Sequence, residues 1–139
     1  MRKLYLNNKV IVNDIKEIQT ANAQISKFIN KKDNDFYGFG ELYGSIIKKN
    51  EIKAWKMQKL NTMNIFVLIG SVKFVFSDKK NTFQISINSK NNKRITVLPG
   101  IFYGFKGLVN KSMVINLINN THDEKKNTKK PLDYIGFNW

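Results

Sequence analysis

The chain has 139 residues, of which 42% are hydrophobic and 24% are charged, and it contains no cysteine and a single histidine, His122. This length suits one domain with a single core and is too short for two domains with separate cores. Disulfides, thiolate catalysis and cysteine-based zinc or iron–sulfur sites are excluded, and so is a metal site built on several imidazoles. We therefore expect no bound metal and no other cofactor.

The sequence offers no segment that would cross a membrane as a helix, because no run of about 18 apolar residues is present. Residues 1–9 contain neither an apolar run of about 7–15 residues nor a small-residue cleavage site, so a signal peptide is not expected. We therefore predict a cytoplasmic protein with no membrane partner.

The formal net charge is +14, carried by 22 lysines and two arginines against ten acidic residues. Direct recognition of nucleic-acid bases favours the planar guanidinium of arginine, which is nearly absent. The chain also holds 19 asparagines and 17 isoleucines, and lysine, asparagine and isoleucine share A/T-rich codons. We favour codon bias as the origin of the charge, with a preference for an anionic small ligand second and nucleic-acid binding third.

The first predicted element is a helix over residues 13–23. Asn13 or Asp14 can cap its start, and Ile15 and Ile18 then share one face. This is the only helix that the pattern indicates.

Short β-rich runs follow, with turn signals every 8–12 residues or so. The turns are predicted at residues 78–81 and 90–93, and the pattern is typical of an all-β sandwich or barrel rather than a βαβ sheet. The predicted strands lie within residues 24–29, 42–47, 63–70, 72–76, 83–87, 95–97 and 113–118.

The last part of the chain changes character twice. Residues 121–130 are polar and rich in charge, and we expect a loop or an extended arm there. Aromatic side chains then reappear near the end of the chain, at Tyr134, Phe137 and Trp139. Three aromatic residues near a terminus are seldom left in solvent, so we expect them to pack on the body of the domain or on a second subunit.

Several of these segments resemble the dTDP-4-dehydrorhamnose 3,5-epimerase family over residues 23–139. The resemblance rests on FGELYGS at 39–45, IKAWKMQ at 52–58, GSVKFV at 70–75 and LPGIFYGFKGL at 98–108. His122-Asp123 and the closing Phe137-Asn138-Trp139 are similar to the end of short members that consist of the cupin domain alone. The resemblance implies a cupin, that is, a double-stranded β-helix or jelly roll, in one domain (1–139). Residues 22–120 would form the barrel and residues 121–139 a C-terminal arm, and two chains would form a homodimer.

The resemblance also implies a chemistry and a partner, a nucleotide-linked 4-keto-6-deoxysugar. In that family a base removes a proton next to the C4 ketone, a cation or hydroxyl stabilises the enolate, and an acid reprotonates the other face, without a metal. In this chain Lys56 stands in the place of the base, Lys53 in that of an arginine, and Gln58 is kept. Met63 replaces the family's lysine and Asn116 its tyrosine, whereas Tyr103 replaces the histidine of the Pro-x-Gly-x-x-His-Gly-Phe turn.

Strict alternation along residues 53–58 places Lys56 and Gln58 on one face and Lys53 on the other. In the family's register Lys56 points into the barrel mouth, where it is a candidate base, a cation that contacts the ligand, or simply an exposed side chain. Tyr103 and Tyr43 are the candidate acids, and either can instead pack at the rim of the barrel. The predicted catalytic residues are therefore Lys56 and Tyr103, and the predicted substrate-binding residues are Lys53, Gln58, Tyr43, Asn64 and Asn116.

Three functions remain open from the sequence. The first is an epimerase-like cupin that acts on or binds a dTDP- or UDP-linked 4-keto sugar for surface polysaccharide synthesis. The second is a binding module that kept the fold and lost the chemistry, and the third is a basic β-barrel associated with nucleic acid. His122 is expected to be exposed, and Trp55 and Trp139 either pack in the core or stack on a nucleotide base.

Overall fold

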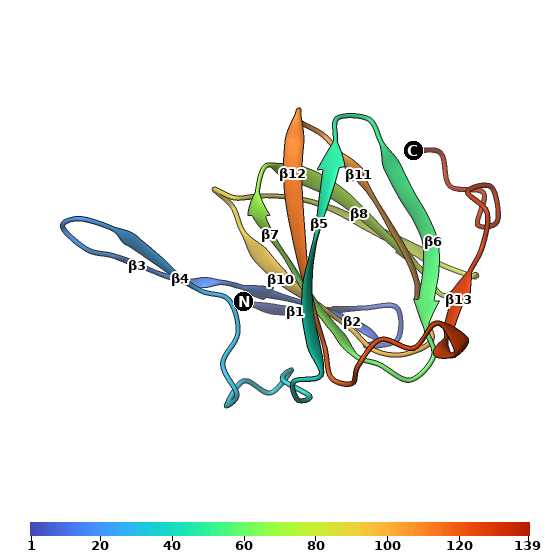
Figure 1. Ribbon diagram of the computed structural model, residues 1–139, viewed down its shortest axis with the longest axis horizontal. Coiled ribbons are helices and arrows are strands. Elements are labelled where there is room, and N and C mark those ends of the chain that lie inside the picture. Colours follow the sequence, from blue (N-terminus) through green and yellow to red (C-terminus); the bar gives the residue numbers. More distant parts are fainter.

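The computed structural model describes all 139 residues as two packed antiparallel sheets with a projecting hairpin (Figure 1). The six-stranded sheet has the order β1 (Arg2–Tyr5), β2 (Val10–Asp14), β10 (Lys93–Val97), β7 (Met63–Ile69), β12 (Lys111–Ile118), β5 (Glu41–Lys48). The five-stranded sheet has the order β13 (Asn127–Lys129), β6 (Ile52–Gln58), β11 (Phe102–Gly107), β8 (Ser71–Ser77), β9 (Thr82–Asn88). The hairpin pairs β3 (Lys16–Gln19) with β4 (Gln24–Lys27), and a single 3₁₀ turn spans Glu124–Lys126. The all-β cupin jelly roll predicted from the sequence is confirmed.

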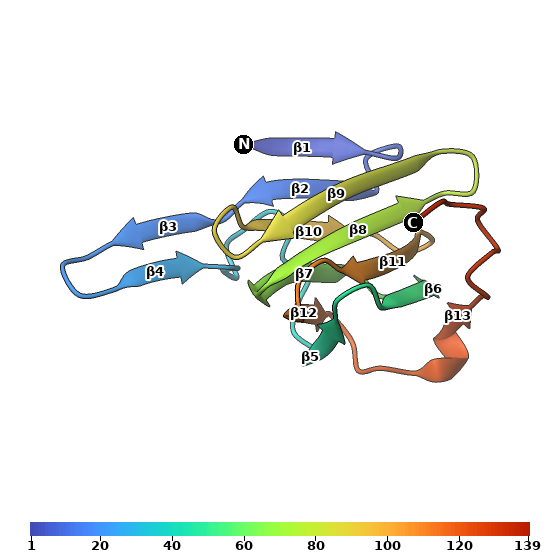
Figure 2. The ribbon, with the colours of Figure 1, turned by 90° about the horizontal axis from the view of Figure 1, so that it is seen from above.

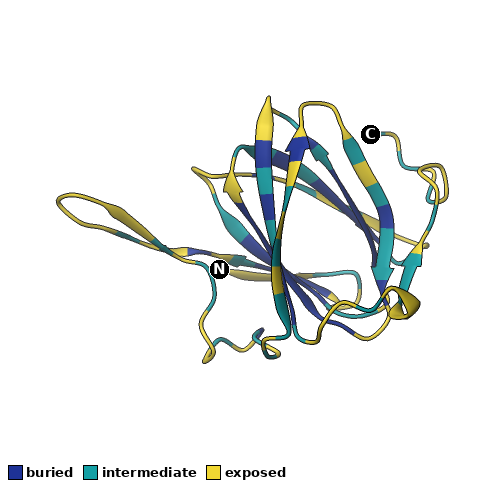
Figure 3. Ribbon diagram, in the orientation of Figure 1, coloured by how far each residue is buried: buried dark blue, intermediate teal, exposed yellow.

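The core lies between the two sheets because alternate residues of their strands point inward. Met63, Ile65 and Val67 of β7 belong to the same buried cluster as Phe74 and Phe76 of β8. Figure 3 shows the burial concentrated where the sheets face each other, and exposure along the hairpin and the loops. No helix in the structure has the length and apolar character needed to cross a membrane.

The helix predicted over residues 13–23 is wrong. Residues 16–19 form β3 instead, and Ile18 is paired with Ile25 of β4. The turn at the tip is closed by Thr20, whose Oγ1 accepts a hydrogen bond from the Ala23 backbone N–H at 2.9 Å. β-Branched residues at alternate positions favour a strand when a second strand follows and pairs with it. Here that second strand begins only after the last residue of the predicted helix. The hairpin extends away from the sheets in both views (Figures 1 and 2).

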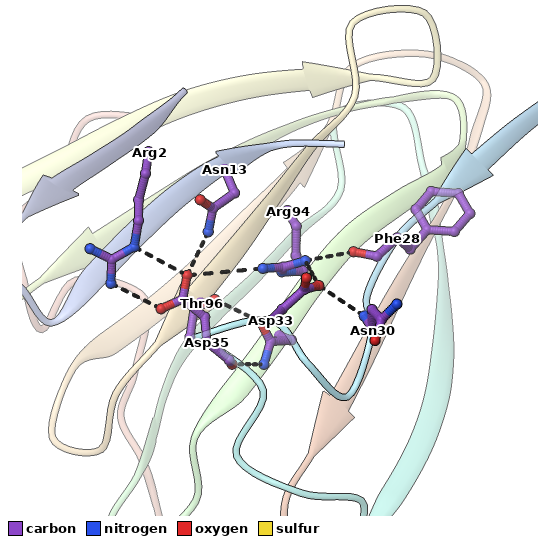
Figure 4. Close-up of polar contacts among 9 residues, drawn as sticks. Arg2, Asn13, Phe28, Asn30, Asp33, Asp35, Arg94 and Thr96 are labelled. Atoms are coloured by element: carbon purple, nitrogen blue, oxygen red, sulfur yellow. Dashed lines mark hydrogen bonds and ion pairs between the residues drawn. The ribbon is translucent and has the colours of Figure 1, made fainter. Parts of the chain in front are cut away.

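The segment between β4 and β5 covers part of the outer face of the six-stranded sheet, where an ionic network holds it (Figure 4). The Asp35 carboxylate accepts hydrogen bonds from Arg2 Nη2 at 3.0 Å and Asn13 Nδ2 at 2.7 Å. Arg94 Nη1 donates to the Phe28 carbonyl at 2.8 Å. Burial tends to raise the pKa of Asp35, but the hydrogen bonds and the charges of Arg2 and Arg94 outweigh it and leave the pKa lowered.

The C-terminal arm, residues 121–139, adds β13 to the edge of the five-stranded sheet, and its aromatic end packs on the outer face of that sheet, as the aromatic residues there predicted. Trp55 is 1% exposed, and its ring centroid lies 5.4 Å from that of Trp139. Its Nε1–H donates to the Leu132 carbonyl at 2.9 Å. The rings of Phe102 and Tyr134 are also in contact, with centroids 5.3 Å apart. Both tryptophans therefore serve packing, and the arm is an integral part of the domain.

Candidate functional site

A cavity of about 300 Å³ opens between the two sheets. Its wall from the five-stranded sheet carries Lys53, Lys56 and Tyr103, and its wall from the six-stranded sheet carries Tyr43 and Asn116. No carboxylate lines it. The other lining residues are Ser45, Ile52, Ala54, Trp55, Ile65, Phe105, Val114, Lys129 and Lys130.

A β-bulge decides which side chains of β6 reach the cavity. Lys56 is paired with Tyr103 and Lys53 with Phe105, so two residues of β6 oppose the single residue Gly104. The extra residue restores Lys53 to the same face as Lys56, and both line the cavity. The prediction from strict alternation, with Lys53 on the opposite face, is therefore wrong. Gly104 is required here, because a Cβ on it would lie 2.5 Å from the Ala54 Cβ.

Lys56 is half-buried in a strongly basic setting. Burial lowers the pKa of its ammonium group, and the neighbouring charges of Lys53 and Lys129 lower it further. Glu124 acts in the opposite direction as the weakest of these influences. The lowered pKa makes the neutral amine, the form that accepts a proton, more accessible at Lys56 than in an exposed lysine.

Tyr103 faces the cavity beside Lys56 and keeps its phenol neutral. Burial raises the pKa of Tyr103, the nearby Tyr43 hydroxyl raises it further, and the Gln58 side chain acts against both. Tyr43 shows the same effect, because burial raises its pKa more than hydrogen bonding to Asn116 lowers it. Both hydroxyls therefore remain hydrogen-bond donors over the physiological pH range.

Asn116 joins three neighbouring strands within the wall of the six-stranded sheet. Its Nδ2 donates to the Tyr43 hydroxyl at 2.9 Å and lies 3.3 Å from Met63 Sδ. Its Oδ1 is buried and has no hydrogen-bond partner in the protein. An unpaired buried acceptor is costly, so this amide is suited to accept a hydrogen bond from a ligand hydroxyl.

Two of the predicted substrate-binding residues lie elsewhere. Asn64 is on the outer face of the six-stranded sheet, where it donates to the Asp35 carbonyl at 2.9 Å and accepts from Thr96 Oγ1 at 2.6 Å. It alternates with Met63, which points into the core, so the Asn64 side chain points away from the cavity that a substrate-binding residue would have to face. Gln58 does not line the cavity, but it is buried next to it, where its side chain contacts the Tyr103 hydroxyl and accepts a hydrogen bond from Asn61 Nδ2 at 3.4 Å.

A smaller groove adjoins the cavity and shares Lys56 and Lys129 with it. Its remaining lining residues are His122, Glu124 and Asn127. His122 is exposed, as expected, and its Nδ1 lies 3.2 Å from Asn127 Nδ2. No group of three or more histidine, aspartate and glutamate side chains is placed to hold a metal ion. The sequence interpretation missed Lys129, because the position of the arm depends on its packing against Trp55.

Comparison with solved structures places this geometry in a known fold. One similar structure is a dTDP sugar isomerase from Desulfovibrio desulfuricans G20. The alignment covers 94% of this chain and 90% of the isomerase, with a TM-score of 0.87 and 22% sequence identity. The rmlC epimerase of Mycobacterium tuberculosis matches all of this chain over 78% of its own, with a TM-score of 0.91 and 11% identity. QdtA, a sugar 3,4-ketoisomerase from Thermoanaerobacterium thermosaccharolyticum, matches 94% over 93% of its own, with a TM-score of 0.80 and 16% identity.

The chain has the fold of the dTDP-sugar epimerases and isomerases. The resemblance found in the sequence is thus confirmed at the level of the fold. No protein-family model and no curated protein matches the chain by sequence. Since identities of 22% and below establish a shared fold only, the chemistry has to be argued from the cavity itself.

Proposed function

We propose that the protein binds a dTDP- or UDP-linked 4-keto-6-deoxysugar in the cavity and catalyses metal-independent proton exchange beside the ketone, as an epimerase or isomerase of surface polysaccharide synthesis. The observation that carries the proposal is the pairing of Lys56, whose pKa is lowered, with the neutral hydroxyl of Tyr103 on the same wall. The ligand class comes from the solved structures that share the fold, one of them a sugar 3,4-ketoisomerase in complex with TDP.

The neutral amine of Lys56 takes the proton from the carbon next to the ketone. Electrons of that C–H bond move to the C4 oxygen as an enolate, and Lys56 becomes an ammonium ion. The Tyr103 hydroxyl donates a hydrogen bond to the enolate oxygen, and the charge of Lys53 stabilises it further. Tyr43, from the facing sheet, is suited to return a proton to the other face of the sugar. Proton transfer through solvent from the Lys56 ammonium group to the Tyr43 phenolate then restores both residues.

Solvent exchange tests this proposal directly. In D₂O the protein is expected to incorporate deuterium at C3 or C5 of dTDP-4-keto-6-deoxyglucose, followed by proton NMR and by mass. Lys56→Met should slow the exchange by about 100- to 10,000-fold, and Lys80→Met, which changes an exposed turn lysine, should leave it intact. Binding of the ligand with no exchange above buffer would refute catalysis.

A binding module without catalysis is the second candidate. It is favoured by Met63, which occupies the place of the family's enolate-stabilising lysine and contacts Asn116 instead. This candidate predicts tight binding of the nucleotide sugar with equal deuterium content in the wild-type and Lys56→Met samples.

A further inference from the structure

The C-terminal arm forms part of the wall of both the cavity and the adjoining groove. Its strand β13 adds to the edge of β6, where Lys129 is paired with Lys56. The next residue continues the ladder: the Trp55 N–H donates to the Lys130 carbonyl at 3.1 Å, and the Lys130 N–H donates to the Trp55 carbonyl at 3.0 Å. The main chain therefore fixes the place of Lys129 beside the candidate base.

Lys129 and Lys56 form a like-charged pair across this ladder. Residues directly opposite each other on neighbouring strands share a face, and like charges there are destabilising. Both lysines line the cavity as well as the groove, so the pair stands where the two hollows meet. The cavity contains no carboxylate that would offset the repulsion, and the groove contains only Glu124.

The arm is held in place by groups other than Lys129. Trp139 packs against Trp55, Tyr134 packs against Phe102, and these contacts lie on the outer face of the sheet. The ammonium group of Lys130 lies 5.0 Å from the centre of the Tyr134 ring. Lys129 takes part in no salt bridge, in no side-chain hydrogen bond and in no cation–π contact within the chain. Its charge at the junction is consequently available for an anionic ligand.

We propose that the arm completes the ligand site and that Lys129 binds the diphosphate of the nucleotide sugar at the junction of cavity and groove. The inference rests on the proposed function and assigns the charged part of its ligand. The sugar then lies in the cavity between Tyr103 and Asn116. The nucleoside extends along the groove toward His122, and the diphosphate passes Lys129 between them. Lys129 thereby has two effects, since it attracts the diphosphate and lowers the pKa of the base in the free protein.

Calorimetry with inorganic pyrophosphate, dTDP and thymidine tests the assignment. Lys129→Met should weaken binding of pyrophosphate and dTDP about tenfold to a hundredfold, the usual loss for a charged hydrogen bond. Thymidine binding should be unchanged. Lys129→Arg should retain most of the affinity, and Lys125→Met, which removes an exposed charge from the same arm but lines neither hollow, should match the wild type. The wild type should lose more affinity for dTDP than Lys129→Met does when salt is raised, because ions screen the contact.

The outcomes separate this inference from the proposed function. Equal affinities of Lys129→Met and Lys125→Met for dTDP would overturn the role of Lys129, even if the wild type exchanges deuterium into the sugar. Pyrophosphate binding that depends on Lys129, without binding of the 4-keto sugar nucleotide, would support the diphosphate subsite and overturn the proposed function. Absence of pyrophosphate and dTDP binding to the wild type would overturn both.

Discussion

Lys56 on β6 stands directly opposite Tyr103 on β11, and both side chains line the cavity between the sheets. The first group has a lowered pKa and the second a raised pKa, and burial is the main cause in both. Burial favours the uncharged form of each, which makes a proton acceptor of the amine and keeps the phenol a donor. The pair thus offers an acceptor and a donor side by side in one wall, without a histidine.

Replacement of Lys56 tests this pair. Lys56→Met is expected to slow deuterium exchange by about 100- to 10,000-fold, the usual contribution of a general base. The melting temperature should change little, because the variant removes both the desolvation of an ammonium group and its repulsion by Lys53 and Lys129. Exchange kinetics by NMR and thermal unfolding measure the two effects.

Lys80→Met is the matched control for charge, since Lys80 is exposed in the turn after β8. Lys79 is unsuitable, because its ammonium group lies 5.7 Å from the ring centres of both Phe102 and Tyr134 and so touches the arm. Equal rates in Lys56→Met and the wild type would remove Lys56 from the chemistry.

The pH dependence of exchange follows from the charges around Lys56. The base acts as a free amine, so the rate should rise with pH and level off at the pKa of Lys56, below the ordinary value for lysine. Lys53→Met removes a repelling charge, so the pKa of Lys56 should rise and the ascending limb should move to higher pH. Glu124 acts in the opposite direction, and Glu124→Gln should move the limb to lower pH. A Lys53→Met limb at the same or lower pH would contradict this account.

The period of two by itself predicted β4, β5, β7, β8, β9, β10 and β12, but not β1, β2, β3, β6, β11 or β13. Residues 83–87 alternate apolar and polar side chains and form β9, with Ile87 buried and Ser86 exposed. The pattern failed at residues 13–23, where local spacing suits a helix. There the decisive contact, Ile18 with Ile25, connects two segments on either side of a turn.

The site was predictable only in part, because three of its determinants are not local. The bulge opposite Gly104 brings Lys53 to the same face as Lys56. The alternation of side chains along β7 turns Asn64 outward, and the pairing of the C-terminal arm with β6 places Lys129 beside the cavity. Each depends on pairing between distant strands, which a single sequence does not specify.

The ionic network on the outer face predicts a dependence of stability on Asp35. Its side chain is 4% exposed and forms ion pairs with both arginines of the chain, Arg2 and Arg94. Asp35→Ala removes a buried acceptor from both guanidinium groups, but Arg2 is half-exposed to water and Arg94 keeps Asp33 and the Phe28 carbonyl. The substitution should therefore cost about 1–3 kcal/mol of unfolding free energy. Urea unfolding of Asp35→Ala against Asp133→Ala, an exposed aspartate, measures the loss, and equal stabilities would contradict it.

The same carboxylate gives stability a defined pH dependence. Its folded-state pKa is lowered, so its contribution is full above the unfolded-state value of about 3.9 and is lost as the pH falls through the folded-state pKa. The unfolding free energy of the wild type should therefore decrease below about pH 4. Asp35→Asn, which does not titrate, should decrease less steeply over the same range. Parallel curves for the two proteins would exclude Asp35 as a source of the acid sensitivity.

The projecting hairpin β3–β4 leads us to expect a homodimer. A two-stranded hairpin is marginally stable by itself, and this one packs on nothing else in the chain. Ile25, in its second strand, is 46% exposed. If the β3–β4 hairpins of two copies exchange, each would cover this side chain and the free edge of β1 of its partner in a symmetric way. Light scattering at micromolar concentration should give twice the chain mass of 16.2 kDa.

Ile25→Glu tests whether the hairpin makes the contact. It places a charge on the apolar side of the hairpin and should give a monomer of 16.2 kDa, with the buried core of the barrel unchanged. Asn22→Glu adds the same charge at the exposed tip of the hairpin and should remain dimeric, because it removes no apolar contact. A wild type that scatters as a single chain would refute the dimer. A dimer that persists in Ile25→Glu would place the interface elsewhere, for example on β5, where Leu42 and Ile46 are 55% and 61% exposed.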